Sequence, residues 1–204
     1  MSSITTVEAL RRIIGTPNAL VPRKIHRELN DRAIAFVGKS PMLMLATADA
    51  SGFPTVSPKG DLPGFVQVDG RRTLWLPERK GNKLIFSLTH VLANPQVGLI
   101  FLLPGTDETL RVQGTAELLD DPDICQRLGA RGAPALLAMR IQVTECYFHC
   151  AKTFLRSNLW KPDSWPGKMA ISFGCEIAQN AGMDANSIEA FDEGVARRYQ
   201  TDLW

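Results

Sequence analysis

The spacing of apolar residues changes from a helical to a strand-like period at Pro41. Before that point, apolar residues recur at helical intervals over Val7–Ile14, behind a capping box that begins at Thr5. A second amphipathic helix is predicted over Ile25–Val37. We expect these two helices to form an extension, residues 1–35, ahead of the main domain.

After Pro41 the chain consists mainly of short apolar or alternating segments separated by turn residues. The predicted strands are Met42–Ala48, Phe53–Ser57, Phe65–Val68, Thr73–Leu76, Val97–Leu103, Thr109–Leu119 and Met139–Cys150. Helices are predicted over Asn82–Ala93, from Asp121 and near Ser187–Tyr199. Strands joined by tight turns, without βαβ crossovers, argue against a Rossmann sheet and predict a closed or half-closed antiparallel barrel with helices plugging its openings.

Composition and charge indicate an ordinary globular protein. The 204 residues are 45% hydrophobic and 22% charged, with a net charge of +2. This balance argues against a protein that coats nucleic acid or an anionic membrane. No apolar stretch approaches the roughly 20 residues that span a bilayer, and no secretory signal is visible. We therefore expect a cytoplasmic protein that binds neither nucleic acid nor membrane.

The four cysteines show no CxxC pair, which favours reduced thiols. His149 lies between Cys146 and Cys150, but period-two alternation in a strand would place it on the opposite face. No second cluster supplies the remaining ligands of a tetrahedral site. We therefore predict no metal site.

The first candidate for chemistry is the end of the second predicted strand. Its residues are Ser57, Pro58, Lys59, Gly60 and Asp61. The proline ends ladder donation, the glycine allows close backbone approach, and the lysine presents a cation where the strand ends. A polar strand end followed by a turn is the alternative interpretation.

The second candidate is the loop before the helix predicted from Asn82. Its residues are Pro77, Arg79, Lys80, Gly81, Asn82 and Lys83. Cations are unfavourable at a helix N-terminus unless an anion is bound, so this loop is a candidate phosphate site. A solvated basic loop is the alternative.

Two further segments could contact a flat ligand. Alternation places Thr109 and Arg111 on one strand face, which could equally be an ordinary solvent face. After the last strand come four residues suited to contacting an aromatic ligand: His149, Lys152, Arg156 and Trp160. A surface segment with a buried tryptophan anchor is the alternative.

In combination, these segments resemble the FMN-binding split-barrel family related to pyridoxamine 5′-phosphate oxidase, over roughly residues 36–162. The segments that carry the resemblance are ATADASGFPTVSPKGD (46–61), LPERKGNK (76–83), NPQVGLIFLLPG (94–105), ETLRVQG (108–114) and HCAKTFLRSNLW (149–160). The resemblance implies a mainly β fold with flanking helices, a six-stranded antiparallel split β-barrel. It also implies a homodimer with FMN at the subunit interface, contacted by the candidate residues above. Residues 163–204 would be a C-terminal loop and helix that pack on the barrel or dimer.

The resemblance implies an FMN-dependent oxidoreductase that passes electrons between a reduced donor such as NAD(P)H and a small organic acceptor. The oxidase's arginine-rich strand appears here as Thr55–Lys59, and its C-terminal substrate-phosphate motif is not recognisable. Oxidation of pyridoxamine phosphate itself is therefore not predicted, and no catalytic residue is assigned. A flavin carrier or sensor without turnover, or a split barrel that binds haem or a deazaflavin, are the alternative functions.

Overall fold

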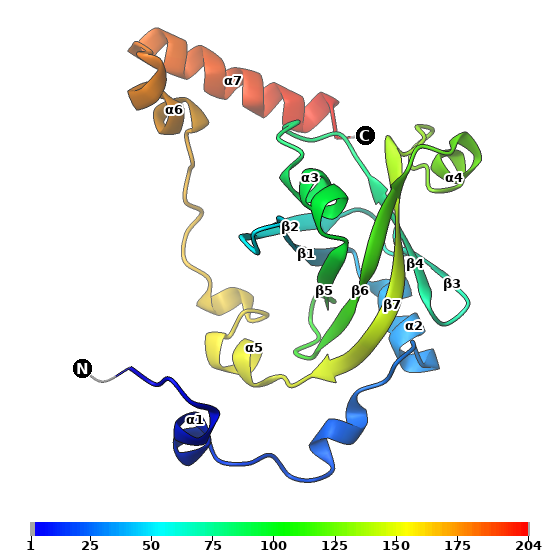
Figure 1. Ribbon diagram of the computed structural model, residues 1–204. Coiled ribbons are helices and arrows are strands. Elements are labelled where there is room, and N and C mark those ends of the chain that lie inside the picture. Colours follow the sequence, from blue (N-terminus) through cyan, green and yellow to red (C-terminus); the bar gives the residue numbers. More distant parts are fainter. Residues whose placement is uncertain (1–2, 204) are drawn as a thin grey trace.

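The computed structural model describes residues 3–203, which form a strongly curved antiparallel sheet with helices around it (Figure 1). The sheet has the strand order β2-β1-β5-β6-β7-β4-β3. Its strands are β1 (Met42–Ala48), β2 (Pro54–Gly60), β3 (Gln67–Asp69), β4 (Thr73–Glu78), β5 (Gln96–Leu102), β6 (Thr109–Leu119) and β7 (Leu137–His149). The predicted mainly β fold with flanking helices is confirmed.

The described part of the chain contains seven strands, matching the seven segments predicted from the apolar pattern, whereas the count of six implied by the resemblance is not confirmed. The additional pairing is a short hairpin, in which β3 and β4 are joined through Gly70 in a left-handed conformation. β3 pairs with β4 alone and ends the sheet, while β2 forms the opposite edge. The ladder does not close, and the sheet is an open barrel with a split between these edges.

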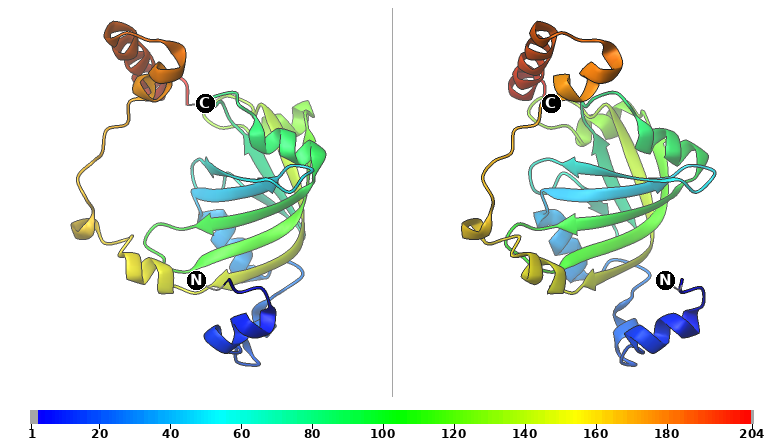
Figure 2. Two further views of the ribbon diagram at one scale, coloured as in Figure 1. Left: turned by 60° about the vertical axis from the view of Figure 1, so that its left-hand side comes forward. Right: turned by 90° about the vertical axis from the view of Figure 1, so that its left-hand side faces the viewer.

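The concave side of the sheet holds the main hydrophobic core. Along β1, Leu43 and Leu45 are fully buried while the residues between them are partly exposed. Two helices, α2 (Asp31–Lys39) and α3 (Phe86–Ala93), lie at opposite sides of the barrel (Figure 2). α2 contributes Phe36 to the core and α3 contributes Val91. The predicted plugging of the barrel openings by helices agrees with this arrangement.

The helix predicted from Ile25 begins only at Asp31. Its N-cap is Asn30, whose side-chain oxygen accepts a hydrogen bond from the Ala33 amide at 3.0 Å. The preceding residues pair with the sheet instead: His26 exchanges two backbone hydrogen bonds with Cys146. The prediction of one continuous helix from Ile25 is therefore wrong. The apolar residues of this stretch belong partly to a β-bridge and partly to α2.

The helix predicted from Asn82 likewise begins later, at Phe86. Lys83 and Ile85 both have positive φ angles, 62° and 49°, which are incompatible with a continuous helix. Gly81 and Asn82 consequently lie in an irregular loop after β4 and not at a helix N-terminus. The prediction that Gly81 and Asn82 lie at a helix N-terminus, where the helix dipole would favour a phosphate, is therefore wrong.

The pairing of β6 with β7 contains a bulge near Glu145. The β6–β7 register shifts so that Gln113 faces Glu145 while Gly114 faces Val143. Thr144 is the extra residue, and it bends β7 across the barrel. The short helix α4 (Pro122–Arg127), which contacts β7, starts at the predicted position.

The terminal segments extend away from the barrel (Figures 1 and 2). They contain α1 (Val7–Ile14) and η1 (Val21–Lys24) at the N-terminal side, and α5 (Lys152–Ser157), η2 (Pro162–Ser164), α6 (Phe173–Ala181) and α7 (Ala185–Thr201) at the C-terminal side. α1 and α7 were predicted, whereas α5 and α6 were not. α1 buries none of its residues, and α6 packs against α7. Within residues 3–203, no helix combines the length and apolar character needed to cross a membrane.

Candidate functional site

A cavity of about 550 Å³ lies where β2 ends beside the loop that follows β4. It is lined by most residues of the first two candidate segments: Ser57, Pro58, Lys59, Gly60, Pro77, Arg79, Lys80, Gly81, Asn82 and Lys83. These segments are about twenty positions apart in sequence, and the fold brings them together at the split of the barrel. Asp61 lines a smaller adjoining hollow of about 220 Å³ together with Arg79.

Two ion pairs cross the split beside the cavity. Lys59 Nζ on β2 donates to Glu78 Oε2 on β4 at 2.5 Å, and Arg79 Nε donates to Asp61 Oδ2 at 2.8 Å. Arg79 also donates through Nη2 to the backbone oxygen of Leu128 at 2.8 Å. All four side chains are at least four-fifths buried, and the Asp61 carboxylate is 1% exposed. These pairs connect edges that no backbone ladder joins, and they neutralise two of the candidate cations.

Lys80 and Lys83 remain as exposed cations on the cavity wall. Lys80 Nζ donates to Asp202 Oδ1, just beyond α7, at 2.7 Å. This hydrogen bond, with the charges of Lys80, Lys83 and Arg198, holds the pKa of Asp202 below its usual value. No ion pair to Lys83 is present in the part of the chain that the structure describes. An anion in the cavity would therefore meet one free ammonium and one that is shared with an exposed carboxylate.

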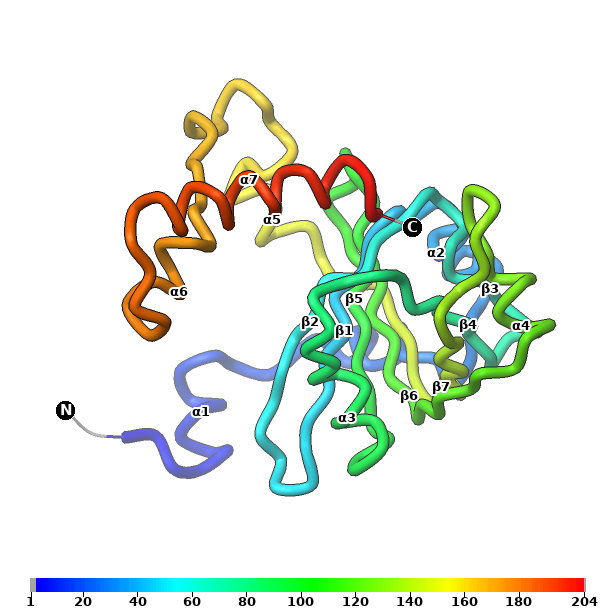
Figure 3. Tube along the Cα trace, turned by 90° about the horizontal axis from the view of Figure 1, so that it is seen from above, coloured from blue at the N-terminus to red at the C-terminus, as the bar shows by residue number. Residues whose placement is uncertain are grey.

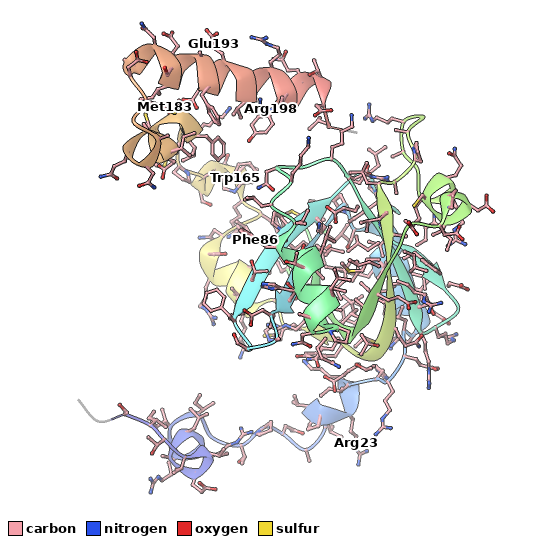
Figure 4. All side chains as sticks on the ribbon, turned by 45° about the horizontal axis from the view of Figure 1, so that its top comes forward. Arg23, Phe86, Trp165, Met183, Glu193 and Arg198 are labelled. Atoms are coloured by element: carbon pink, nitrogen blue, oxygen red, sulfur yellow. The ribbon has the colours of Figure 1, made fainter. Side chains whose placement is uncertain are left out.

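Another part of the cavity lining is apolar and was not predicted as part of a site. It is formed by Leu84, Ile85, Phe86, Leu136 and Leu137. Phe86 lies at the start of α3, at the side of the barrel (Figure 4). Its side chain and those of Leu84 and Ile85 are more than half exposed, although they are large and apolar. The consecutive apolar run Leu84–Phe86 is the signal in the sequence, but the helical spacing of Leu84 and Ile85 favours a buried helix face instead.

The backbone of this loop is strained where it borders the cavity. Ile85 is β-branched and has φ 49°, ψ 19°, a left-handed conformation that such residues rarely adopt. Lys83 adopts φ 62° two residues earlier. Strain of this kind costs of order 1–3 kcal/mol per residue and is concentrated at functional sites. The loop holds the ammonium of Lys83 and the apolar wall on the same cavity.

The remaining candidate residues do not line this cavity. Thr109 on β6 is paired with His149 on β7, and Arg111 is paired with Tyr147. Trp160 Nε1 donates to the Thr106 oxygen at 2.9 Å, and its ring stacks on Phe154 at 5.6 Å. Lys152 and Arg156 lie on the exposed surface of α5. The candidate residues of one chain thus form two separate groups, one lining the cavity and the other on β6, β7 and the segment that follows β7.

The open, curved antiparallel sheet and the cation-bearing cavity at its split define a half-closed β-barrel protein with a candidate site for an anionic ligand. The family model described as pyridoxamine 5′-phosphate oxidase matches residues 29–150, which span all seven strands. The chain belongs to this family, and the predicted relationship is confirmed.

Comparison with solved structures gives more distant similarities. HupZ of Group A Streptococcus is 17% identical, covers 59% of this chain and 93% of its own, and has a TM-score of 0.48. A putative pyridoxamine 5′-phosphate oxidase from Lactobacillus delbrueckii is 24% identical, with coverages of 60% and 95% and a TM-score of 0.46. An FMN-binding protein from Syntrophomonas wolfei is 13% identical, with coverages of 58% and 83% and a TM-score of 0.44. No curated protein sequence matches the chain.

Proposed function

We propose that this protein binds FMN in the cavity at the split of the barrel and acts as an FMN-dependent oxidoreductase. The supporting observation is the composition of the cavity wall, in which the ammonium groups of Lys80 and Lys83 face the same space as Leu84, Ile85 and Phe86. FMN combines a doubly charged phosphate with a flat, largely apolar ring system. A volume of about 550 Å³ is within the roughly 300–1,000 Å³ of typical small-molecule sites.

In this proposal each part of the wall has a separate task. Lys80 and Lys83 hold the phosphate through charge-assisted hydrogen bonds. Leu84, Ile85 and Phe86 pack against the ring and exclude water from it. Lys59 lines the cavity while paired with Glu78, so its charge is already neutralised before a ligand binds. FMN, when bound, supplies the ability to accept a hydride and pass on electrons, which no amino-acid side chain provides.

The second group of candidate residues reaches the ring in a homodimer. Thr109, Arg111 and His149 lie on β6 and β7, away from the cavity of their own chain. We propose that they contact FMN, or a substrate beside it, across an interface with a second copy, together with Lys152, Arg156 and Trp160. The reaction then moves electrons from a reduced donor such as NAD(P)H to a small organic acceptor.

Absorption spectroscopy of the purified protein tests this proposal. We expect flavin bands, present on purification or acquired with added FMN, that bleach when NADPH is added under argon. Bound flavin that no cellular donor reduces faster than free FMN would instead indicate a carrier or sensor. Haem or deazaflavin bands would indicate a different ligand in the same fold. A protein that stays colourless with added FMN would refute the proposal.

Charge reversal at Lys83 tests the position of the phosphate. Lys83→Glu replaces a charge-assisted contact by repulsion, so we expect FMN affinity to fall by about tenfold or more. Lys39→Glu is the control, because Lys39 is equally exposed but lies at the end of α2. Isothermal titration of both variants with FMN makes the comparison. Equal affinities in the two variants would place the phosphate elsewhere.

A further inference from the structure

Three basic side chains gather on the outer face of β6 and β7, outside the cavity. Arg111 on β6 lies directly opposite Tyr147 on β7, and His149 follows two positions along the same strand. Directly paired residues project to the same side of a sheet, as do residues two apart along a strand. Arg111, Tyr147 and His149 therefore share one face.

The third basic group comes from the N-terminal extension. The paired hydrogen bonds between His26 and Cys146, at 2.9 and 2.8 Å, attach this segment along β7. They bring Lys24 of η1 over the ring of Tyr147, with Nζ 5.6 Å from the ring centroid. A residue more than a hundred positions away in sequence thus joins the face that carries Arg111 and His149.

No ion pair within residues 3–203 neutralises the cations of this cluster. The Nε atom of Arg111 is buried and has no hydrogen-bond partner. Among residues 3–203, no carboxylate forms an ion pair with Lys24 or Arg111. Glu145, two positions before Tyr147, lies on the same face of the sheet but forms no such pair either. Leaving a buried charged donor without a partner is unfavourable, so an acceptor bound at this atom would stabilise the arrangement.

The behaviour of His149 agrees with this arrangement. Burial lowers the pKa of its imidazole, and the nearby charges of Arg111 and Lys24 lower it further. The ring is therefore largely neutral at pH 7. It can donate one hydrogen bond and can take up a proton when a negative charge arrives beside it.

We propose that Lys24, Arg111 and His149 form an oxyanion site that binds the carboxylate or phosphate group of the protein's small organic substrate. The two cations supply the charge, the free Nε–H of Arg111 supplies a directed donor, and His149 supplies a second. That the bound molecule is a substrate rests on the proposed flavin chemistry, whereas the anion site itself does not.

Sulfate is the probe for this site, because it does not titrate in the range where histidine does. The chain has three histidines, so their ring signals can be followed separately by NMR during pH titrations, with His149→Gln identifying the signal of interest. We expect sulfate to raise the pKa of His149 by about one unit and to leave His26 and His90 unchanged. No response of His149 to sulfate would overturn the proposal.

Variants identify the groups that hold the anion. We expect Arg111→Gln to abolish the sulfate response and Lys24→Gln to weaken sulfate binding at least threefold, while Arg12→Gln, an exposed arginine on α1, changes nothing. Lys24 is exposed, so its variant keeps the test valid if Arg111→Gln fails to fold. A response that survives both substitutions would refute the assignment.

Two further measurements separate this inference from the flavin proposal. Acetate and inorganic phosphate, titrated in place of sulfate, show whether the site favours a carboxylate or a phosphate. FMN titration of the same samples shows the cofactor independently. Flavin binding without a sulfate response would refute only the oxyanion site, and a sulfate response without flavin binding would refute only the proposed function.

Discussion

At the scale of single residues, the sheet leaves no room for a side chain at Gly114. A Cβ atom at this position would lie 2.3 Å from the backbone oxygen of Gln142 and 3.0 Å from Ile141 Cγ2. The contact arises at the β6–β7 bulge, where Thr144 is inserted opposite the register shift. The bend of β7 and the absence of a side chain at Gly114 are thus one feature of the fold.

Gly114→Ala tests this dependence. Because the new methyl group would meet rigid backbone on β7, we expect the free energy of unfolding to fall by about 1–3 kcal/mol. Gly38→Ala is the matched control, since no atom lies within 4 Å of a Cβ built there and alanine favours the helix. Urea denaturation of both variants measures the difference. Equal stabilities would show that the bulge can relax around a methyl group.

At the scale of elements, β2 and β4 are joined across the split by side chains. The Asp61–Arg79 pair is the more buried of the two bridges. Asp61→Asn leaves a largely buried guanidinium facing a neutral amide, so we expect a loss of about 2–4 kcal/mol in the free energy of unfolding. Asp31→Asn is the control, because Asp31 also pairs with an arginine but is 87% exposed.

We expect the Asp31 variant to lose less than about 1 kcal/mol, since exposed ion pairs contribute little. Thermal or urea unfolding monitored by circular dichroism compares the two. Similar losses would mean that the bridge at the split does not stabilise the barrel more than a surface pair does.

The end of α7 bears on the cavity through the Lys80–Asp202 pair. Asp202 accepts a hydrogen bond from the Lys80 ammonium, which in the proposed function binds the FMN phosphate. The C-terminal end of α7 lies near the loop after β4 (Figures 1 and 3). We expect Asp202→Asn to raise FMN affinity about two- to fivefold, the range of one exposed ion pair. Glu193→Gln, on the side of α7 turned away from the barrel, is the control (Figure 4).

A double-mutant cycle with Lys80→Gln separates competition from a general field effect. If Asp202 competes for Lys80, its substitution has no effect on affinity once Lys80 is removed. An equal gain with and without Lys80 would mean that the carboxylate merely repels the ligand. Isothermal titration with FMN gives all four affinities.

At the scale of the whole molecule, many large apolar side chains among residues 3–203 are exposed to solvent. The outer face of β2, β1 and β5 presents Val56 beside Ala46 and Gly98, and Val56 is 60% exposed. α1 exposes Ile13 and Ile14 on its apolar face. Exposed apolar side chains on a sheet face or helix face can mark an association surface. They support the proposed homodimer, in which this sheet face meets a second copy.

Val56→Glu tests the homodimer. A charge introduced into an apolar interface would have to be buried unpaired, so we expect the dimer dissociation constant to rise at least tenfold. Leu92→Glu, an equally apolar and exposed position on α3, is the comparison. Sedimentation equilibrium measures both. A wild-type protein that sediments as a flavin-loaded monomer would contradict the dimer and the composite site.

The candidate site was only partly predictable from the sequence. The segments around Lys59 and Lys83 could be found because local composition marks them: a strand end with Pro58 and Gly60, and a basic loop. Which cations are free could not be found. Arg79 is bound by Asp61 and by the backbone of Leu128, partners that no local pattern connects to it.

Taken alone, the sequence determined the features that depend on neighbours a few positions away. These include the alternation of the strands, the hairpin turns, the start of α4 at its Asp121 cap and the relationship to the oxidase family. The tertiary structure decided where α2 and α3 begin, because a bridge from His26 to Cys146 and the strained loop at Ile85 override helical spacing. It also decided the charge of each site, since ion pairs form between groups that meet only after the sheet has curved.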